Sequence, residues 1–77
     1  MMTIFTVHQG KRYRATIVLG WVERWATNAA IAAKLRSAGF MDVMVEGSGG
    51  LRTAEGRWTL PDATAELPAQ IRDVAPV

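Results

Sequence analysis

Apolar residues occupy alternate positions from Tyr13 to Leu19, and the polar residues Arg14 and Thr16 lie between them. This period of two is typical of a β-strand with one buried face and one face open to solvent. Val18 is an exception, because it is apolar but shares the face of Arg14 and Thr16. The pattern therefore predicts a strand here, with an apolar residue on its open face.

Three further segments have the composition of strands. Residues 3–8 are β-branched and aromatic, which predicts a short strand or an ordered arm. Residues 41–46 alternate in the same way as the first strand, with Met44 as an apolar residue on the polar face. Residues 51–60 predict the return strand of a hairpin, because the glycine-rich sequence 47–50 favours a tight turn.

Between residues 21 and 38 there is no glycine or proline, and alanine is frequent, which predicts a helix. Two starts fit this segment. The helix begins either near Trp21 or directly after Thr27, whose hydroxyl group is a favoured N-cap. Gly39 predicts the end, because glycine adopts the left-handed conformation that closes many helices. The apolar stripe of this helix consists of Ile31, Leu35 and Ala38.

Residues 63–74 predict two short helical turns. Asp62 can cap the first turn, and Pro68 can start the second, since a proline inside one long helix would cost about 3 kcal/mol. The resulting order is strand, strand, helix, strand, strand, helix. It predicts an α+β fold, a two-layer sandwich with a mainly antiparallel sheet, both helices on one face and a ferredoxin-like arrangement.

The length of 77 residues corresponds to a single small domain, 1–77. The absence of cysteine excludes a disulfide framework and a thiolate metal site. No apolar run approaches the roughly 20 residues that span a membrane. The sequence also lacks the basic region of a secretory signal, so we expect a cytoplasmic protein that does not enter a membrane.

Charge is distributed unevenly along the chain. Residues 1–39 carry six basic side chains and one acidic one, whereas residues 40–77 carry three basic and six acidic ones. A chain with a basic half and an acidic half favours association with itself or with a polar partner. The net charge of +2 is low for a nucleic-acid-binding protein, whose affinity depends on many phosphate contacts.

Candidate catalytic residues are few. His8 is the only histidine, and neither Ser37 nor Ser48 has the sequence context of a nucleophile. No spacing of His8 with carboxylates matches a metal site. We therefore expect a protein without catalytic activity, metal or cofactor.

The three tryptophans have different expected environments. Trp58 fits the buried face of a strand. Trp21 and Trp25 lie one turn apart if the helix starts early, and both lie in a loop if it starts after Thr27. We expect Trp25 to belong to the core and Trp21 to be partly exposed, as the candidate anchor for a partner, because tryptophan is enriched at interface hot spots.

Several motifs between residues 14 and 58 are shared with one known family. Residues 16–21 are a strand followed by a glycine and an aromatic residue, Asn28-Ala29 starts a helix, and Leu35 precedes the pair Gly39-Phe40 at its end. This stretch resembles a SPOR (sporulation-related) domain. The resemblance implies a binding module for peptidoglycan strands that lack stem peptides. It also implies that residues 3–8 take the place of the family's last strand.

We thus expect a non-catalytic module that binds a protein partner or forms a homodimer through its sheet or an edge strand. The SPOR-like glycan-binding domain is the alternative. A nucleic-acid-binding module using residues 11–14 is a second alternative, although we expect no such binding. The candidate binding residues are Arg14, Thr16, Val18, Trp21, Met44 and Arg52, of which Arg14, Thr16, Val18 and Arg52 are those that the SPOR resemblance places on the open sheet face.

Overall fold

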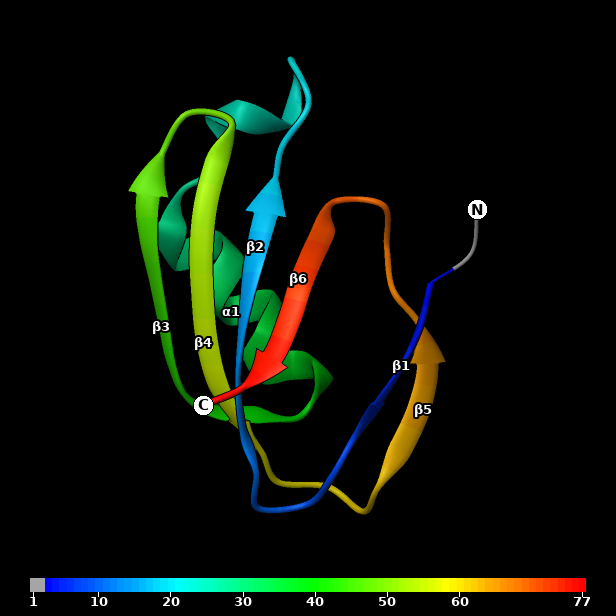
Figure 1. Ribbon diagram of the computed structural model, residues 1–77. Helices are drawn as coiled ribbons and strands as arrows, with labels where there is room; N and C mark the ends of the chain where they lie inside the picture. Colours follow the sequence, from blue (N-terminus) through cyan, green and yellow to red (C-terminus); the bar gives the residue numbers. More distant parts are fainter. Residues whose placement is uncertain (1–2) are drawn as a thin grey trace.

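The computed structural model describes residues 3–77 and contains one α-helix and six antiparallel strands in two sheets (Figure 1). The larger sheet has the strand order β3-β4-β2-β6, and a separate ribbon pairs β1 with β5. The helix lies behind the larger sheet in Figure 1, and the ribbon lies beside it. The elements are β1 Ile4–Val7, β2 Arg12–Val18, the 3₁₀ turn η1 Glu23–Trp25, α1 Asn28–Ala38, β3 Phe40–Ser48, β4 Leu51–Trp58, β5 Ala63–Glu66 and β6 Ile71–Pro76.

The alternating pattern of the sequence defines the two central strands as expected. Tyr13 lies opposite Gly56, so the largest buried side chain of β2 faces a residue of β4 that has no side chain, and the next pair on this face is Ala15 with Ala54. Trp58 is buried, as its place in the sequence predicts, and its ring packs edge-on against Phe40 with 5.0 Å between centroids. The apolar residues that the structure buries most deeply are Tyr13, Ile17, Ala32, Ala54 and Trp58.

The second of the two helix starts is the one observed. The hydroxyl oxygen of Thr27 accepts a hydrogen bond from the Ala30 amide at 3.0 Å, and α1 begins at the next residue, Asn28. Gly39 follows the helix with φ of 128°, a conformation that favours glycine. Residues 21–26 therefore lie outside α1, which decides where the tryptophans are placed.

The expected second helix is wrong. Residues 63–66 form β5 against β1, and residues 71–76 form β6 against β2. Pairing explains the difference, because each segment satisfies the backbone groups of a strand that would otherwise have no partner on that side. Residues 3–8 were expected to replace the last strand of a SPOR sheet, but β1 pairs with β5 in the separate ribbon, and β6 completes the larger sheet instead. A ferredoxin-like order is therefore not confirmed, although the α+β class is.

Both outer strands of the larger sheet contain a bulge. Between Met41 and Met44, two residues of β3 oppose one of β4, and β6 has a matching irregularity opposite β2. Asp42 has φ of 52° and Asp73 has φ of 53°, so each bulge includes an aspartate in the left-handed conformation. Bulges of this kind bend an edge strand and interrupt the row of groups that could pair with another chain.

No helix in residues 3–77 has the length and apolar character needed to cross a membrane.

Replacement of Thr27 by alanine tests the observed start of α1. We expect Thr27→Ala to lower the free energy of unfolding by about 1 kcal/mol, because the Ala30 amide loses its acceptor. Thr27→Ser keeps the hydroxyl group and serves as the control, with a change of less than about 0.5 kcal/mol. Urea denaturation followed by circular dichroism measures both. Equal losses in the two variants would show that the cap hydrogen bond does not stabilise the helix.

Candidate functional site

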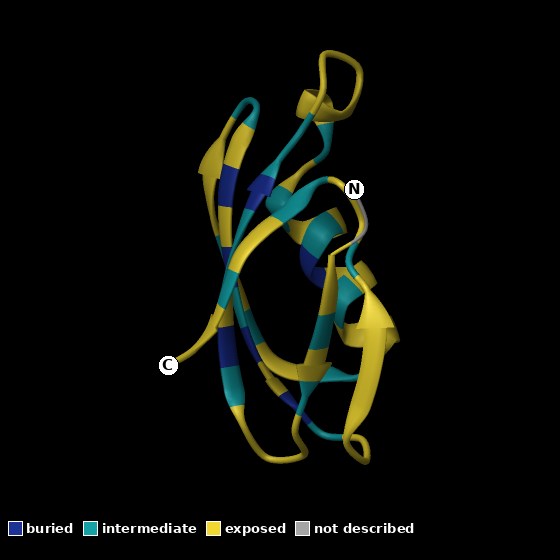
Figure 2. Ribbon diagram, turned by 45° about the vertical axis from the view of Figure 1, so that its right-hand side comes forward, coloured by how far each residue is buried: buried dark blue, intermediate teal, exposed yellow. Residues whose placement is uncertain are grey.

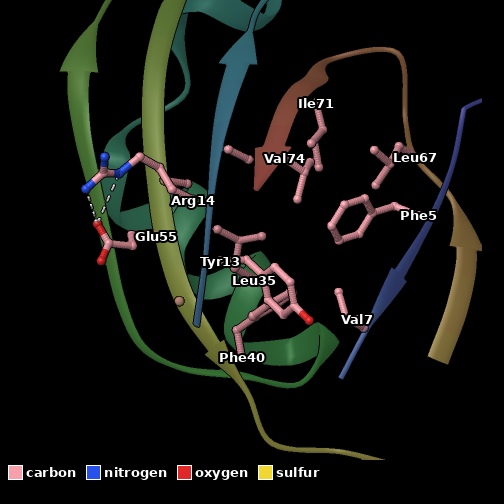
Figure 3. A pocket seen from close by; sticks show the side chains of 13 residues that line it. Phe5, Val7, Tyr13, Arg14, Leu35, Phe40, Glu55, Leu67, Ile71 and Val74 are labelled. Carbon is pink, nitrogen blue, oxygen red and sulfur yellow. Dashed lines mark hydrogen bonds and ion pairs between the residues drawn. The ribbon is translucent and has the colours of Figure 1, made fainter. Parts of the chain in front are cut away.

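Four of the six candidate binding residues lie on the open face of the larger sheet. Arg14 and Thr16 of β2 and Met44 of β3 line one shallow depression there. Val18 lies further along β2, opposite Leu51. Figure 3 shows Arg14 pointing away from the side of the sheet that holds the apolar interior. The sequence pattern thus identified this face correctly.

The arginine side chains of this face form ion pairs with carboxylates of the sheet. Glu55 accepts a hydrogen bond from Arg12 at 2.6 Å and lies 3.3 Å from Arg14, and the bond from Arg12 holds the pKa of Glu55 below its usual value. A further arginine, Arg57, lies 3.3 Å from Asp42. The charges that a nucleic-acid-binding surface would present are therefore partly balanced within the sheet.

Arg52 is not part of this face, which corrects the expectation that it binds a ligand there. Arg52 is only 5% exposed, and its side chain lies on the face of the sheet that packs against α1. The guanidinium donates to the carbonyl oxygens of Gly49 and Arg24 at 3.1 and 3.0 Å and to the side-chain oxygen of Asn28 at 2.8 Å. It thereby joins the β3–β4 turn, η1 and the first residue of α1. The sequence contained a signal for this orientation. Arg52 and Trp58 lie an even number of positions apart along β4, so their side chains lie on the same, buried face of the strand.

The most exposed apolar side chains of the structure gather in the segment before α1. Trp21 is 79% exposed, Val22 80% and Trp25 82%; we call these three residues the aromatic lobe. Figure 2 shows this segment exposed at the top of the molecule. Trp21 is exposed as expected, and to a greater extent than the partial exposure predicted for it, whereas its role as an anchor stays a prediction. The expected burial of Trp25 is wrong, because α1 starts after Thr27 and Trp25 lies in η1 instead of on the helix face that packs on the sheet.

Hydrogen bonds hold the backbone of the lobe in place. The carboxylate of Glu23 accepts from the Gly20 amide at 2.9 Å and from the Gln70 side chain at 2.8 Å. The bond from Gly20 is the main reason why the pKa of Glu23 is lowered. The guanidinium of Arg24 lies 5.4 Å from the centre of the Trp21 ring, and the Arg24 carbonyl oxygen is held by Arg52. The exposed tryptophan rings therefore project from a braced turn, meaning one whose backbone is fixed by hydrogen bonds.

A groove runs from this turn along one side of α1, and we call it the α1 groove. Glu23 and Ala26 line it at the lobe, and Ile31 and Leu35 line it along the helix. Pro68, in the loop before β6, forms part of its opposite wall.

A second apolar space lies between the sheet, α1 and the β1–β5 ribbon. This cavity has a volume of about 110 Å³, and its walls include Phe5, Val7, Leu35 and Val74 (Figure 3). The Tyr13 hydroxyl group at one end accepts a hydrogen bond from the His8 amide at 2.7 Å. Apolar side chains of the sheet, of α1 and of the ribbon thus surround this cavity.

The polar contacts of His8 tie the ribbon to the end of the sheet. Its ring nitrogen Nδ1 lies 2.9 Å from the carboxylate of Asp62, which also accepts from the Gln9 amide at 2.8 Å. The bond from Gln9 is the main cause of the lowered pKa of Asp62. Within residues 3–77, no three His, Asp or Glu side chains are grouped so that they could hold a metal ion.

Comparison with models of protein families, with curated proteins and with solved structures gives no match to this chain. The resemblance to SPOR domains therefore stays a hypothesis that rests on the quoted motifs alone.

Replacement of Arg52 tests its role as the link between three segments. We expect Arg52→Ala to lower the free energy of unfolding by about 2–4 kcal/mol, because it leaves three acceptors without their donor and removes buried side-chain volume. Arg57→Ala is the matched control on the same strand, with an expected loss of about 0.5 kcal/mol, since its ion pair is exposed. Urea denaturation compares the two. A loss in Arg52→Ala no larger than in Arg57→Ala would contradict the structural role.

Acid titration tests the lowered pKa values. A carboxyl group with a lowered pKa in the folded state stabilises the fold above its ordinary pKa, and this contribution disappears as the pH falls through the lowered value. The ordinary values are 4.5 for Glu23 and Glu55 and 3.8 for Asp62. We therefore expect the melting temperature of the wild type to fall more steeply between about pH 5 and pH 3 than that of Glu55→Gln. Equal slopes in the wild type and Glu55→Gln would contradict this contribution of Glu55.

Proposed function

We propose that this protein is a non-catalytic binding module that recognises a partner protein through the aromatic lobe. The observation that carries the proposal is the near-complete exposure of Trp21, Val22 and Trp25 on one short, braced turn. Exposed apolar side chains that gather on one segment are typical of interaction sites, and tryptophan is among the residues that contribute most to protein interfaces.

Energetics favour the lobe over the sheet as the main contact. A tryptophan can bury roughly 150–250 Å² in an interface, and truncation of such an anchor typically weakens binding by about 2 kcal/mol or more. Because hydrogen bonds already fix the turn, little backbone order has to be gained on binding. The open sheet face offers Met44 and Val18 as apolar contacts, but its arginines are largely engaged with Glu55 and Asp42.

The other two hypotheses have less support. A glycan-binding sheet face would need an aromatic platform, and within residues 3–77 the strand positions that share the open face with Arg14 contain no aromatic residue. A nucleic-acid-binding surface would need the basic segment 11–14 and Arg52 to converge. Arg52 instead lies buried on the opposite side of the sheet.

A capture experiment with matched variants tests the proposal. The immobilised protein is exposed to a lysate of the organism that encodes it, and retained proteins are quantified by mass spectrometry. We expect the double variant Trp21→Ser/Trp25→Ser to lose a set of retained proteins at least about tenfold, which corresponds to the loss of one hot spot. The control Met44→Ser/Leu60→Ser removes exposed apolar residues elsewhere and should retain them.

Two additional measurements make the result decisive. The melting temperature of the tryptophan variant should stay within about 3 °C of the wild type, because exposed side chains contribute little to stability. Unfolding of this variant, or capture equal to that of the wild type, would contradict the proposal. Light scattering gives the mass in solution; a wild-type dimer that the tryptophan substitutions convert to a monomer would identify a second copy of the chain as the partner.

A further inference from the structure

The aromatic lobe and the α1 groove are parts of one continuous surface. Glu23 and Ala26 belong to the segment that carries the lobe, and both also line the groove. From there the groove continues past Ile31 to Leu35, two half-buried aliphatic residues of α1. A partner that covers the lobe thus finds an apolar channel that leads away from it along the helix.

Two cationic side chains of this surface have no carboxylate partner among the described residues. Lys34 lines the groove, and Arg24 lies beside Trp21. Within residues 3–77, neither side chain forms an ion pair with a carboxylate, in contrast to Arg12, Arg14 and Arg57 on the open sheet face.

The one acidic residue that lines the groove, Glu23, keeps its negative charge, because the groups that donate to it are neutral and lower its pKa. Glu23 already accepts hydrogen bonds with both carboxylate oxygens, from Gly20 and from Gln70. The Glu23 carboxylate holds the turn in place, because both of its bonds are to groups of the same chain. Two cations and one anion leave this surface with a net positive charge. Both oxygens of the anion already accept hydrogen bonds, so Lys34 and Arg24 are the charged groups that a ligand can pair with.

We infer that the partner segment is an acidic peptide with large apolar side chains. Its apolar side chains occupy the α1 groove and contact the tryptophans, and its carboxylates pair with Lys34 and Arg24. This inference rests on the proposed function and adds the chemistry of the partner. A peptide fits better than a nucleic acid, because the walls of the groove are mainly aliphatic and only two unpaired cations are present among the described residues of this surface, whereas the affinity of a nucleic acid depends on many phosphate contacts.

A random dodecapeptide library displayed on phage tests this inference with the full chain as the target. We expect selected peptides to be enriched in aspartate and glutamate together with leucine, phenylalanine or tryptophan. A synthetic peptide of the consensus sequence is then titrated by fluorescence anisotropy. Its affinity should fall at least about tenfold in Trp21→Ser/Trp25→Ser and about fivefold or more in Lys34→Glu. It should also decrease as salt is raised.

Lys11→Glu is the matched control, because it reverses an exposed lysine outside the groove and should change the affinity less than about twofold. Peptides that need the tryptophans but show no acidic enrichment, or that bind Lys34→Glu as well as the wild type, would overturn the inference and leave the proposed function intact. Failure to select any peptide that depends on the tryptophans would count against both. Tighter, tryptophan-dependent binding of a 20-nucleotide oligo(dT) or of phosphatidylserine vesicles than of the consensus peptide would replace the peptide as the partner.

Discussion

The buried guanidinium of Arg52 organises one end of this molecule. A charge removed from water is costly unless hydrogen bonds satisfy it, and here three neutral oxygens from three segments do so. The arrangement depends on its neighbours in the sheet. Gly47 lies opposite Arg52 with φ of 103°, and a Cβ atom at this position would approach the Leu51 carbonyl oxygen to 2.7 Å. The turn between β3 and β4, the 3₁₀ turn η1 and the start of α1 thus all accept hydrogen bonds from Arg52, which is their common polar centre.

The position of the tryptophans follows from this centre. Arg52 holds the Arg24 carbonyl oxygen, and α1 begins only after the Thr27 cap, so the segment that carries Trp21 and Trp25 stays outside the helix. A chain of this size buries only about 60% of its unfolded surface, and large side chains are its main means of building a core. Two tryptophans placed outside that core are therefore hard to explain by stability alone, which is why they point to recognition.

The parts of the fold that follow local rules were predictable from the sequence, and those that depend on distant pairing were not. The alternation around Tyr13 is local, and the structure agrees with it. The cap at Thr27 is also local, but the sequence left two helix starts open, and only the structure decides between them. The segment 63–66 is rich in alanine and has no local feature that predicts a strand, yet it pairs with β1, almost 60 residues earlier in the sequence. In the candidate site, Trp21 and the open sheet face were found in advance. The groove was not, because its opposite wall comes from the mispredicted region around Pro68.

The outer strands of the larger sheet and the aromatic lobe differ in how far their structure disfavours contact with another chain. The edges of β3 and β6 each contain a bulge with a left-handed aspartate, a conformation that costs a non-glycine residue about 1 kcal/mol or more. Such edges discourage pairing with a further strand, and Pro76 removes one more donor from β6. No comparable protection covers Trp21, Val22 and Trp25 among the described residues. The bulged edges thus disfavour pairing with a further strand, whereas the aromatic surface beside Arg24 and Lys34 stays open to solvent. This contrast supports the proposal that the lobe is the main contact.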